Sequence, residues 1–200
     1  MTIRYTALSY ALLAAFAIDT HAGGKPGEQA EEGIGKESTD YALFTTKLMD
    51  YALIDNAYKA NTLASELTLG TYISDYVTVE GRAGWGYGKD QATPGLDVGI
   101  VYWLSWYMGL AYPITEYSTV HGKFGFSHVQ ADTSRDNSNK KFKDIPKDFL
   151  QSTFSMSWAI SGDLAITDDL YVTAEYGRLH NDTTTGVKTT HCGLGILYEF

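Results

Sequence analysis

Residues 149–165 read FLQSTFSMSWAISGDLA, and large apolar residues alternate there with small polar ones. Phe154, Met156 and Trp158 are separated by serines. A period of two places the bulky side chains on one face of a β-strand and the small ones on the other, whereas no helical period fits. The stretch therefore predicts a strand with one apolar face and one polar face.

The same alternation recurs in six further segments, each about as long as a tilted strand needs to be to cross a membrane. In residues 97–112, Val98 and Ile100 fall on the bulky face together with Trp106 and Met108. The other five segments are residues 65–73, 77–87, 117–132, 171–181 and 187–200. Seven strands are predicted on this pattern alone.

An eighth strand is expected in residues 41–54, where the alternation is less regular. Lys47 would face one side and Asp50 the other, unless a β-bulge near Lys47 and Leu48 shifts the phase. An amphipathic helix is the rival interpretation. A strand is favoured because single-chain bacterial barrels have an even number of strands, which brings both termini to one side.

The predicted connections fall into two classes that alternate along the chain. Residues 74–76, 113–115 and 167–169 are short turns, whereas residues 55–64, 88–94, 133–148 and 181–186 are longer and polar. Outer-membrane barrels have short periplasmic turns and longer extracellular loops. A soluble, lipocalin-like barrel would place its bulky residues inside. Here glycine, serine, threonine and charges share the second face, which predicts an all-β, eight-stranded, antiparallel up-and-down transmembrane β-barrel.

The first 40 residues differ from the rest. Residues 1–22 have the features of a secretory signal, with Arg4, an uncharged run and a cleavage site after Ala22. The run is too short for a spanning helix, which needs roughly 20 apolar residues. Residues 23–40 are rich in glycine and glutamate and are expected to form a disordered periplasmic tail before the barrel at 41–200.

Composition excludes several classes of function. The net charge of −9 argues against nucleic-acid binding, which normally requires a basic face. Cys192 is the single cysteine, so an internal disulfide and a cysteine-rich metal site are excluded. Neither a cofactor nor a metal is expected.

Three segments resemble the small outer-membrane barrels of the OmpA, OmpX and opacity-protein type. They are the two strand-turn-strand units at residues 67–80 and 164–176 and the terminal Gly-Leu-Gly-Ile-Leu-Tyr-Glu-Phe at 193–200. The resemblance implies outer-membrane localisation. It also implies that Tyr198 and Phe200 belong to a terminal signal read by the barrel-assembly machinery. The first strand departs from the family because it lacks the usual glycine-rich pattern.

Four charged residues are expected inside the barrel by strand parity: Glu80, Arg82, Lys123 and Glu175. Two acids and two bases can neutralise one another, and each would be costly to bury alone. A polar plug that fills a lumen too narrow for a water channel is favoured over a gate for small ions.

Residues 133–148 form a mildly basic loop on an acidic protein. Lipopolysaccharide phosphates and a host or matrix ligand are candidate partners, alongside outer-membrane lipid, and a solvated mixed-charge loop is the rival interpretation. The candidate contact residues are Arg135, Lys140, Lys141, Lys143 and Lys147.

Enzymatic activity is not expected. Lipid A deacylases of similar size carry a His-x-Ser pair, and neither His121-Gly122-Lys123 nor His128-Val129-Gln130 supplies one. The sequence thus predicts a non-enzymatic barrel with a structural or adhesin-like surface role, a narrow ion or solute channel being the alternative and a lipid A-modifying enzyme a more remote one.

Overall fold

The computed structural model describes residues 35–53, 58–135, 155–182 and 187–200. Its strands are β1 (Asp40–Leu53), β2 (Tyr58–Ser74), β3 (Val77–Gly86), β4 (Asp90–Thr93), β5 (Leu96–Thr115), β6 (Ser118–Arg135), β7 (Ser155–Ala165), β8 (Leu170–Asp182) and β9 (Val187–Glu199). The described part of the chain contains no helix long and apolar enough to cross a membrane. The proposed signal in residues 1–22 and most of the proposed tail lie outside the described residues.

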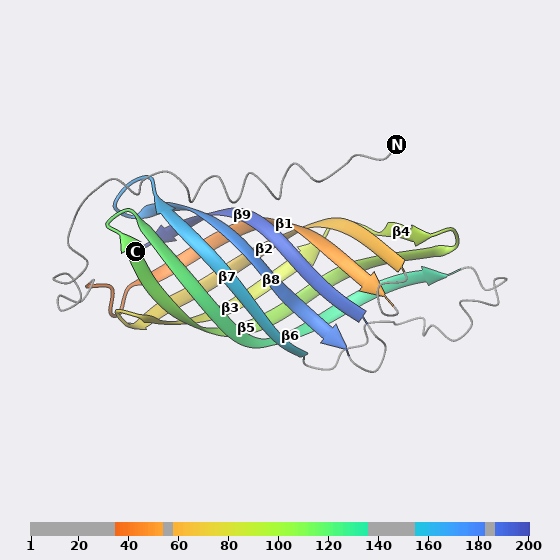
Figure 1. Cartoon of the computed structure of the whole chain (residues 1–200), viewed down its shortest axis with the longest axis horizontal. Helices are drawn as coiled ribbons and strands as arrows, with labels where there is room; N and C mark the ends of the chain where they lie inside the picture. The colour runs from red at the N-terminus through yellow and green to blue at the C-terminus, as the bar shows by residue number, and fades with distance from the viewer. Residues whose placement is uncertain (1–34, 54–57, 136–154, 183–186) are drawn as a thin grey trace. The chain divides into compact units, whose positions relative to one another are not determined.

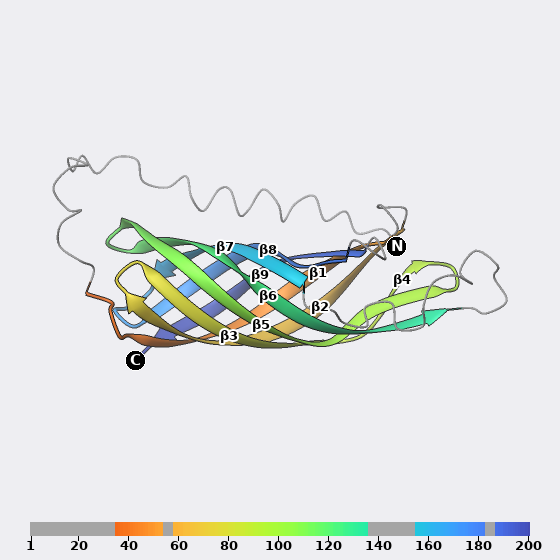
Figure 2. The ribbon, with the colours of Figure 1, turned by 90° about the horizontal axis from the view of Figure 1, so that it is seen from below.

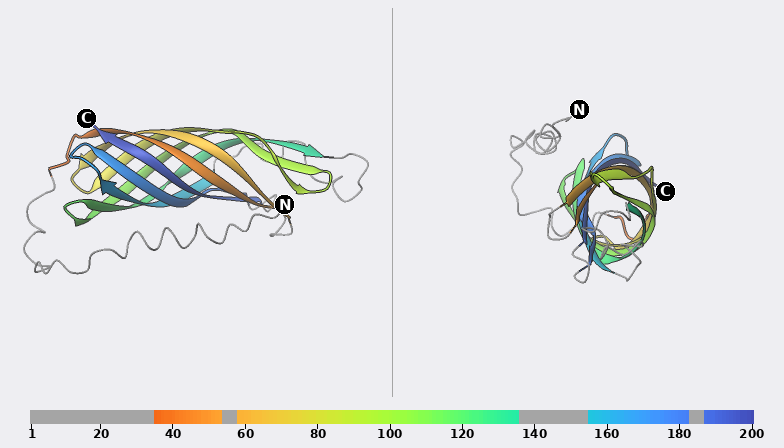
Figure 3. Two further views of the ribbon diagram at one scale, coloured as in Figure 1. Left: turned by 90° about the horizontal axis from the view of Figure 1, so that it is seen from above. Right: turned by 90° about the vertical axis from the view of Figure 1, so that its right-hand side faces the viewer.

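Every strand pairs antiparallel with its neighbours, and the sheet closes on itself (Figure 1). β1 pairs with both β2 and β9, while β3 pairs with both β2 and β5. Seen end-on, the strands form a ring (Figure 3, right). β4 only extends the connection from β3 to β5 as a short hairpin with β5. The predicted eight-stranded antiparallel barrel is confirmed.

The alternation that predicted the strands also sets the barrel's two faces. On β7, Met156 and Ile160 are exposed on the outside and Ser155, Ser157 and Ala159 are buried inside. β9 places Leu194, Ile196 and Tyr198 outside in the same way. The outside bears the bulky residues, as expected of a barrel surrounded by lipid.

The first strand needs no bulge. β1 pairs residue by residue with β2 and β9 without a break, and its side chains alternate throughout. Lys47 is buried inside the barrel and Asp50 is exposed outside. The suggested phase shift near Lys47 and Leu48 is wrong. Lys47 can point into the barrel without a bulge, because its charge is paired there with carboxylates.

A bulge occurs instead in β5. Its pairing with β6 shifts between Ile100 and Tyr102, which leaves Val101 as an extra residue. Val98 and Ile100 therefore point inward, whereas Tyr102 points outward. The assignment of Val98 and Ile100 to the bulky outer face is wrong, because uninterrupted alternation was assumed across the bulge.

Several predicted boundaries also need correction. β2 begins at Tyr58, so the predicted loop at 55–64 is mostly strand. Lys59 and Asn61 face outward there, whereas Leu67 and Leu69 face outward lower in the barrel. β4 lies inside the predicted loop at 88–94. β5 continues through the predicted turn at 113–115. The start of β1 and the end of β9 lie at the same end of the barrel as the short turns (Figure 2).

Candidate functional site: the charged barrel interior

The four charged residues expected inside the barrel do lie together there. Arg82 on β3 binds Glu175 on β8 through two hydrogen bonds of 2.9 Å, and it binds Glu80 at 2.6 Å. Lys123 on β6 lies 2.7 Å from Glu80 and 4.0 Å from Glu175. All four side chains are buried. The structure therefore brings together residues from three strands across the lumen.

Two further charges that the sequence reasoning did not assign complete the group. The Lys47 ammonium lies 2.6 Å from Glu66 and 2.8 Å from Glu175, and Arg82 also donates to Glu66 at 3.3 Å. Glu66 lies one residue before the outward Leu67, so parity alone would have found it. Lys47 was missed because a bulge was invoked in its strand.

We call Lys47, Glu66, Glu80, Arg82, Lys123 and Glu175 the lumen cluster. Its three carboxylates face three cations, so the formal charges cancel. Burying a charge without a partner is costly, and each charge here has at least one opposite partner within 4 Å. The lumen cluster is thus charge-neutral, and none of its charges is left without a partner to bind a passing ion.

Neutral side chains saturate the remaining acceptors of the lumen cluster. Tyr41 donates its hydroxyl to Glu80 at 2.7 Å, and the indole of Trp103 donates to Glu66 at 2.7 Å. The Nε2 of His191 lies 3.0 Å from Glu175. Arg82 also stacks 4.2 Å from the centre of the Tyr107 ring. These contacts fix the charged groups in one arrangement.

Apolar layers lie on both sides of the lumen cluster. Toward the long loops, buried side chains from six strands form a dry core that includes Met49, Leu96, Val98, Val129 and Leu179. Toward the short turns, a second group packs inside the barrel; it consists of Tyr41, Leu43, Tyr72, Ala111 and Leu197. The interior therefore holds the lumen cluster in its middle, an apolar core toward the long loops, and a mixed group toward the short turns in which Asp163 and Glu199 are also buried.

The segment before β1 covers the end of the barrel that bears the short turns. Lys36 hydrogen-bonds to Glu199 and to the hydroxyl of Tyr171, and its ammonium lies 4.7 Å from the centre of the Tyr171 ring. The backbone amide of Lys36 donates to Asp75 at 2.9 Å. These contacts hold the segment across the mouth of the barrel.

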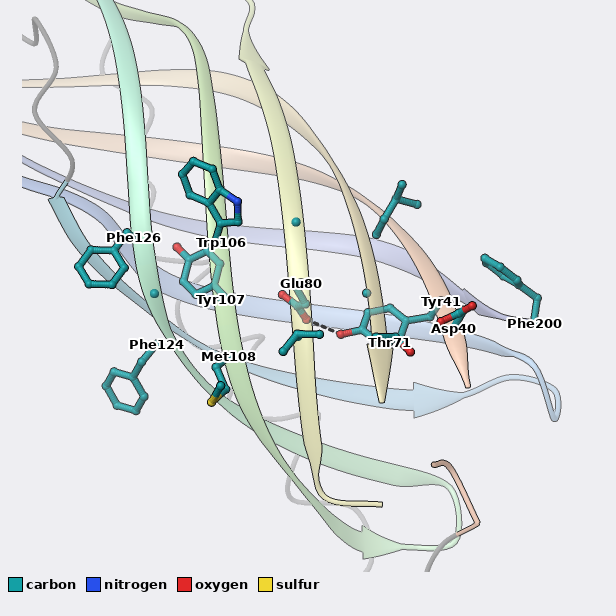
Figure 4. Close-up of a pocket in the computed structure, with 15 residues that line it drawn as sticks. Asp40, Tyr41, Thr71, Glu80, Trp106, Tyr107, Met108, Phe124, Phe126 and Phe200 are labelled. Atoms are coloured by element: carbon teal, nitrogen blue, oxygen red, sulfur yellow. Dashed lines mark hydrogen bonds between the residues drawn. The ribbon is translucent and has the colours of Figure 1, made fainter. Parts of the chain in front are cut away.

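A pocket of about 770 Å³ lies at the wall formed by β2, β3, β5 and β6 (Figure 4). Trp106, Met108 and Phe124 line it from the outer face, and a side chain on Gly81 would meet nothing within 4 Å. Its lining is mainly apolar, as a surface in hydrocarbon requires. Among the described residues that line it there is no histidine, cysteine or serine.

The histidines also fail to form an exposed site within the described residues. His121, His180 and His191 are buried inside the barrel, and the Nε2 of His121 lies 2.8 Å from Asp163. Ser161 is the cross-strand neighbour of His121 and is buried as well. A serine, a histidine and an aspartate do come near one another, but all three are enclosed in the barrel wall, out of reach of a lipid or peptide substrate.

The remaining predicted site residues divide into two groups. Tyr198 and Phe200 lie exposed on the outer face with their rings stacked 6.1 Å apart, and the Phe200 amide donates to the carbonyl of Asp40. Arg135 is the last residue of β6. Four predicted contact residues lie outside the described residues: Lys140, Lys141, Lys143 and Lys147.

Comparison with known families matches residues 8–200 to the outer membrane protein β-barrel domain family. The chain belongs to this family. The resemblance inferred from its sequence is thereby confirmed, and so is its place in the bacterial outer membrane. For this outer-membrane β-barrel domain, a search of curated proteins found no matching relative.

Solved structures share the fold of this outer-membrane β-barrel at low sequence identity. Ail, the attachment invasion locus protein of Yersinia pestis, is 17% identical with a TM-score of 0.55, and the match covers 82% of this chain and 99% of Ail. Neisserial surface protein A is 12% identical with a TM-score of 0.58, covering 80% of this chain and 97% of that protein. These similarities establish the architecture only.

Proposed function

We propose that this protein is a non-enzymatic outer-membrane barrel with a closed lumen, which serves a structural or surface-interaction role through its extracellular loops. The observation that carries the proposal is the charge-balanced lumen cluster, whose charges are all paired and which has a buried apolar core between it and the long loops. A conducting pore would need a continuous polar path, whereas this apolar core lies between the charges and the long loops. The barrel then acts as a rigid support.

The surface role is supported by the chemistry of residues 133–148, which carry five Arg or Lys residues against three Asp residues. Basic loops attract anionic partners through charge complementarity. Ail has been crystallised with the heparin analogue sucrose octasulfate. For this chain we propose an anionic glycan of a host or matrix surface as the loop's partner, with Arg135, Lys140, Lys141, Lys143 and Lys147 as the contacting residues.

Planar-bilayer recordings of the refolded protein test the closed lumen. We expect no steady unitary conductance, because ions would have to displace paired charges and cross the apolar core toward the long loops. Steady, selective conductance that disappears in Glu80→Gln or Lys123→Met would identify a narrow channel instead. A barrel protein of the same size that shows no conductance in the same bilayer serves as the negative control.

Binding to heparin-coated surfaces and to host cells tests the surface role. Replacing the five basic residues of the loop with glutamine should abolish binding that is also sensitive to salt. A matched variant that replaces Asp136, Asp144 and Asp148 with asparagine should bind at least as well. Equal binding by the wild-type protein and the five-glutamine variant would contradict the proposed loop role.

Mass spectra of lipid A from cells that express the protein test the absence of enzymatic activity. We expect spectra identical to those of cells with an empty vector. A change in acyl chains or in phosphate content that requires His121 or Ser161 would instead assign catalysis to the buried group near Asp163.

A further inference from the structure

The strand register defines rows of outward side chains around the barrel, and their chemistry changes sharply near the long loops. One row runs from Leu63 on β2 through Leu48 on β1 and Cys192 on β9 to Tyr176 on β8. These four residues are apolar or aromatic. Aromatic and apolar side chains at this height are typical of a barrel surface at the edge of the hydrocarbon.

The next row toward the loops is polar. It contains Asn61, Asp50, Thr190 and Arg178 on the same four strands. Each step between rows spans two residues, or roughly 7 Å along a strand. The change from Leu48 to Asp50 therefore lies where the hydrocarbon gives way to the headgroups of the outer leaflet.

The following row adds two lysines. Ala52 on β1 is paired with Lys59 on one side and with Lys188 on the other. Two strand spacings separate the lysines, which places their Cα atoms about 10 Å apart. Lys59, Arg178 and Lys188 thus form a set of three outward cations, which we call the basic arc, just above the apolar surface.

Two members of the basic arc, Lys59 and Lys188, line a depression in the outer wall. Its volume is about 310 Å³, and Lys59, Lys188, Asn61 and Thr190 line it. Among the described residues, no ion pair involves Lys59, Lys188 or Arg178. The Nε of Arg178 is buried without a hydrogen-bond partner there. Lys59 and Lys188 therefore line this hollow together with Asp50, and Arg178 lies one row below Lys188, outside the lining.

Acidic neighbours only partly offset these cations. Asp50 also lines the depression, and Asp90 accepts a hydrogen bond from the backbone amide of Asn61 at 3.0 Å. The adjacent wall differs, because Trp85 on β3 and Tyr102 on β5 occupy the outer face there. The positive charge is therefore concentrated over β2, β1, β9 and β8.

We propose that the basic arc binds the phosphorylated headgroup of a lipopolysaccharide molecule in the outer leaflet. The apolar row at Leu48 would contact its acyl chains while Lys59, Lys188 and Arg178 contact its phosphates. The position supports this source of phosphate over a free ion, because the cations lie at headgroup height beside a lipid-facing wall. The site is separate from the loop at 133–148 and from the lumen cluster.

Titration of detergent-refolded protein with purified lipopolysaccharide tests the site. The loss of one cation near an anionic lipid surface weakens binding roughly fivefold. The double variant Lys59→Gln with Lys188→Gln should therefore weaken binding about 25-fold. Lys59→Arg with Lys188→Arg keeps the charges and should bind like the wild-type protein. Unchanged mobility of the folded protein on a denaturing gel verifies folding of both variants.

Two further ligands distinguish the sources of binding. Enzymatically dephosphorylated lipopolysaccharide should bind the wild-type protein as weakly as native lipopolysaccharide binds the double-glutamine variant. Equal affinity for the phosphorylated and dephosphorylated forms, or equal binding by the wild-type and glutamine proteins, would overturn the proposal. If inorganic phosphate displaced lipopolysaccharide as effectively as unlabelled lipopolysaccharide does, the site would bind a free ion, and this result would also overturn the proposal.

Discussion

Single residues decide how the barrel interior is filled. Trp103 is wholly buried because Gly84, its cross-strand neighbour, has no side chain in its way. A Cβ on Gly84 would lie 2.0 Å from the indole. The indole in turn donates to Glu66 of the lumen cluster. A glycine on one strand thus permits a large ring on the next, and that ring anchors a charge.

Gly84→Ala should destabilise the folded barrel by about 1–3 kcal/mol, because the added methyl group forces the Trp103 ring to move. Unfolding in urea, followed by tryptophan fluorescence in detergent micelles, measures the effect. Gly81→Ala is the matched control, since Gly81 faces outward with nothing within 4 Å of the added carbon. If both variants unfolded at the same urea concentration, the packing explanation would be wrong.

The central carboxylate of the lumen cluster is Glu175, which lies within 4 Å of Lys47, Arg82 and Lys123. Glu175→Gln leaves a buried excess of positive charge and should cost about 3–5 kcal/mol of stability. Combining it with Lys47→Met restores charge balance and should recover part of that loss. Glu116→Gln on an exposed turn should leave the urea midpoint unchanged; an equal loss there would contradict the burial argument.

At the scale of elements, β5 shows how one strand serves two surroundings. Below the bulge at Val101 its bulky residues, such as Trp106 and Met108, face lipid, whereas above it Leu96, Val98 and Ile100 face a dry core. A bulge changes which residues point inward without breaking the strand. In the membrane the bulky residues of β5 therefore face outward to lipid. Nearer the long loops they face inward and form a core like that of a soluble barrel.

Deleting Val101 should preserve the upper core, because Ile100 and Tyr102 already pair with the consecutive residues Ala131 and Gln130 and would then follow one another in a regular ladder, with Ile100 still facing inward. Limited proteolysis of the refolded protein in vesicles should then cut residues 90–100 no faster than in the wild-type protein. Val101→Ala keeps the bulge and serves as the control. Faster cleavage of the deletion variant than of Val101→Ala would contradict the reading of Val101 as an extra residue whose removal leaves the pairing of its neighbours intact.

For the whole molecule, β1 and β9 pair along almost their full length, and this pairing closes the ring. A closed barrel whose backbone groups are all paired resists denaturation in detergent. We expect the folded protein to migrate differently on a denaturing gel before and after boiling. A single mobility in both samples would contradict a stable closed barrel.

The sequence by itself determined the barrel class, the inside and outside of most strands and four members of the lumen cluster. Period-two alternation is a local signal, and lipid on one side makes it strong. Glu66 was equally accessible to parity reasoning, because its outward neighbour Leu67 had already been assigned.

Only the tertiary structure revealed the bulge at Val101, the absence of a bulge in β1 and the full length of β2. Near the long loops the barrel is no longer surrounded by lipid, so the rule that bulky residues face outward ceases to apply, and residues 58–64 no longer resemble a membrane strand. Lys47 joined the lumen cluster for a related reason. Whether a charge can be buried depends on partners from distant strands, such as Glu175, and closure of the ring is what brings them together.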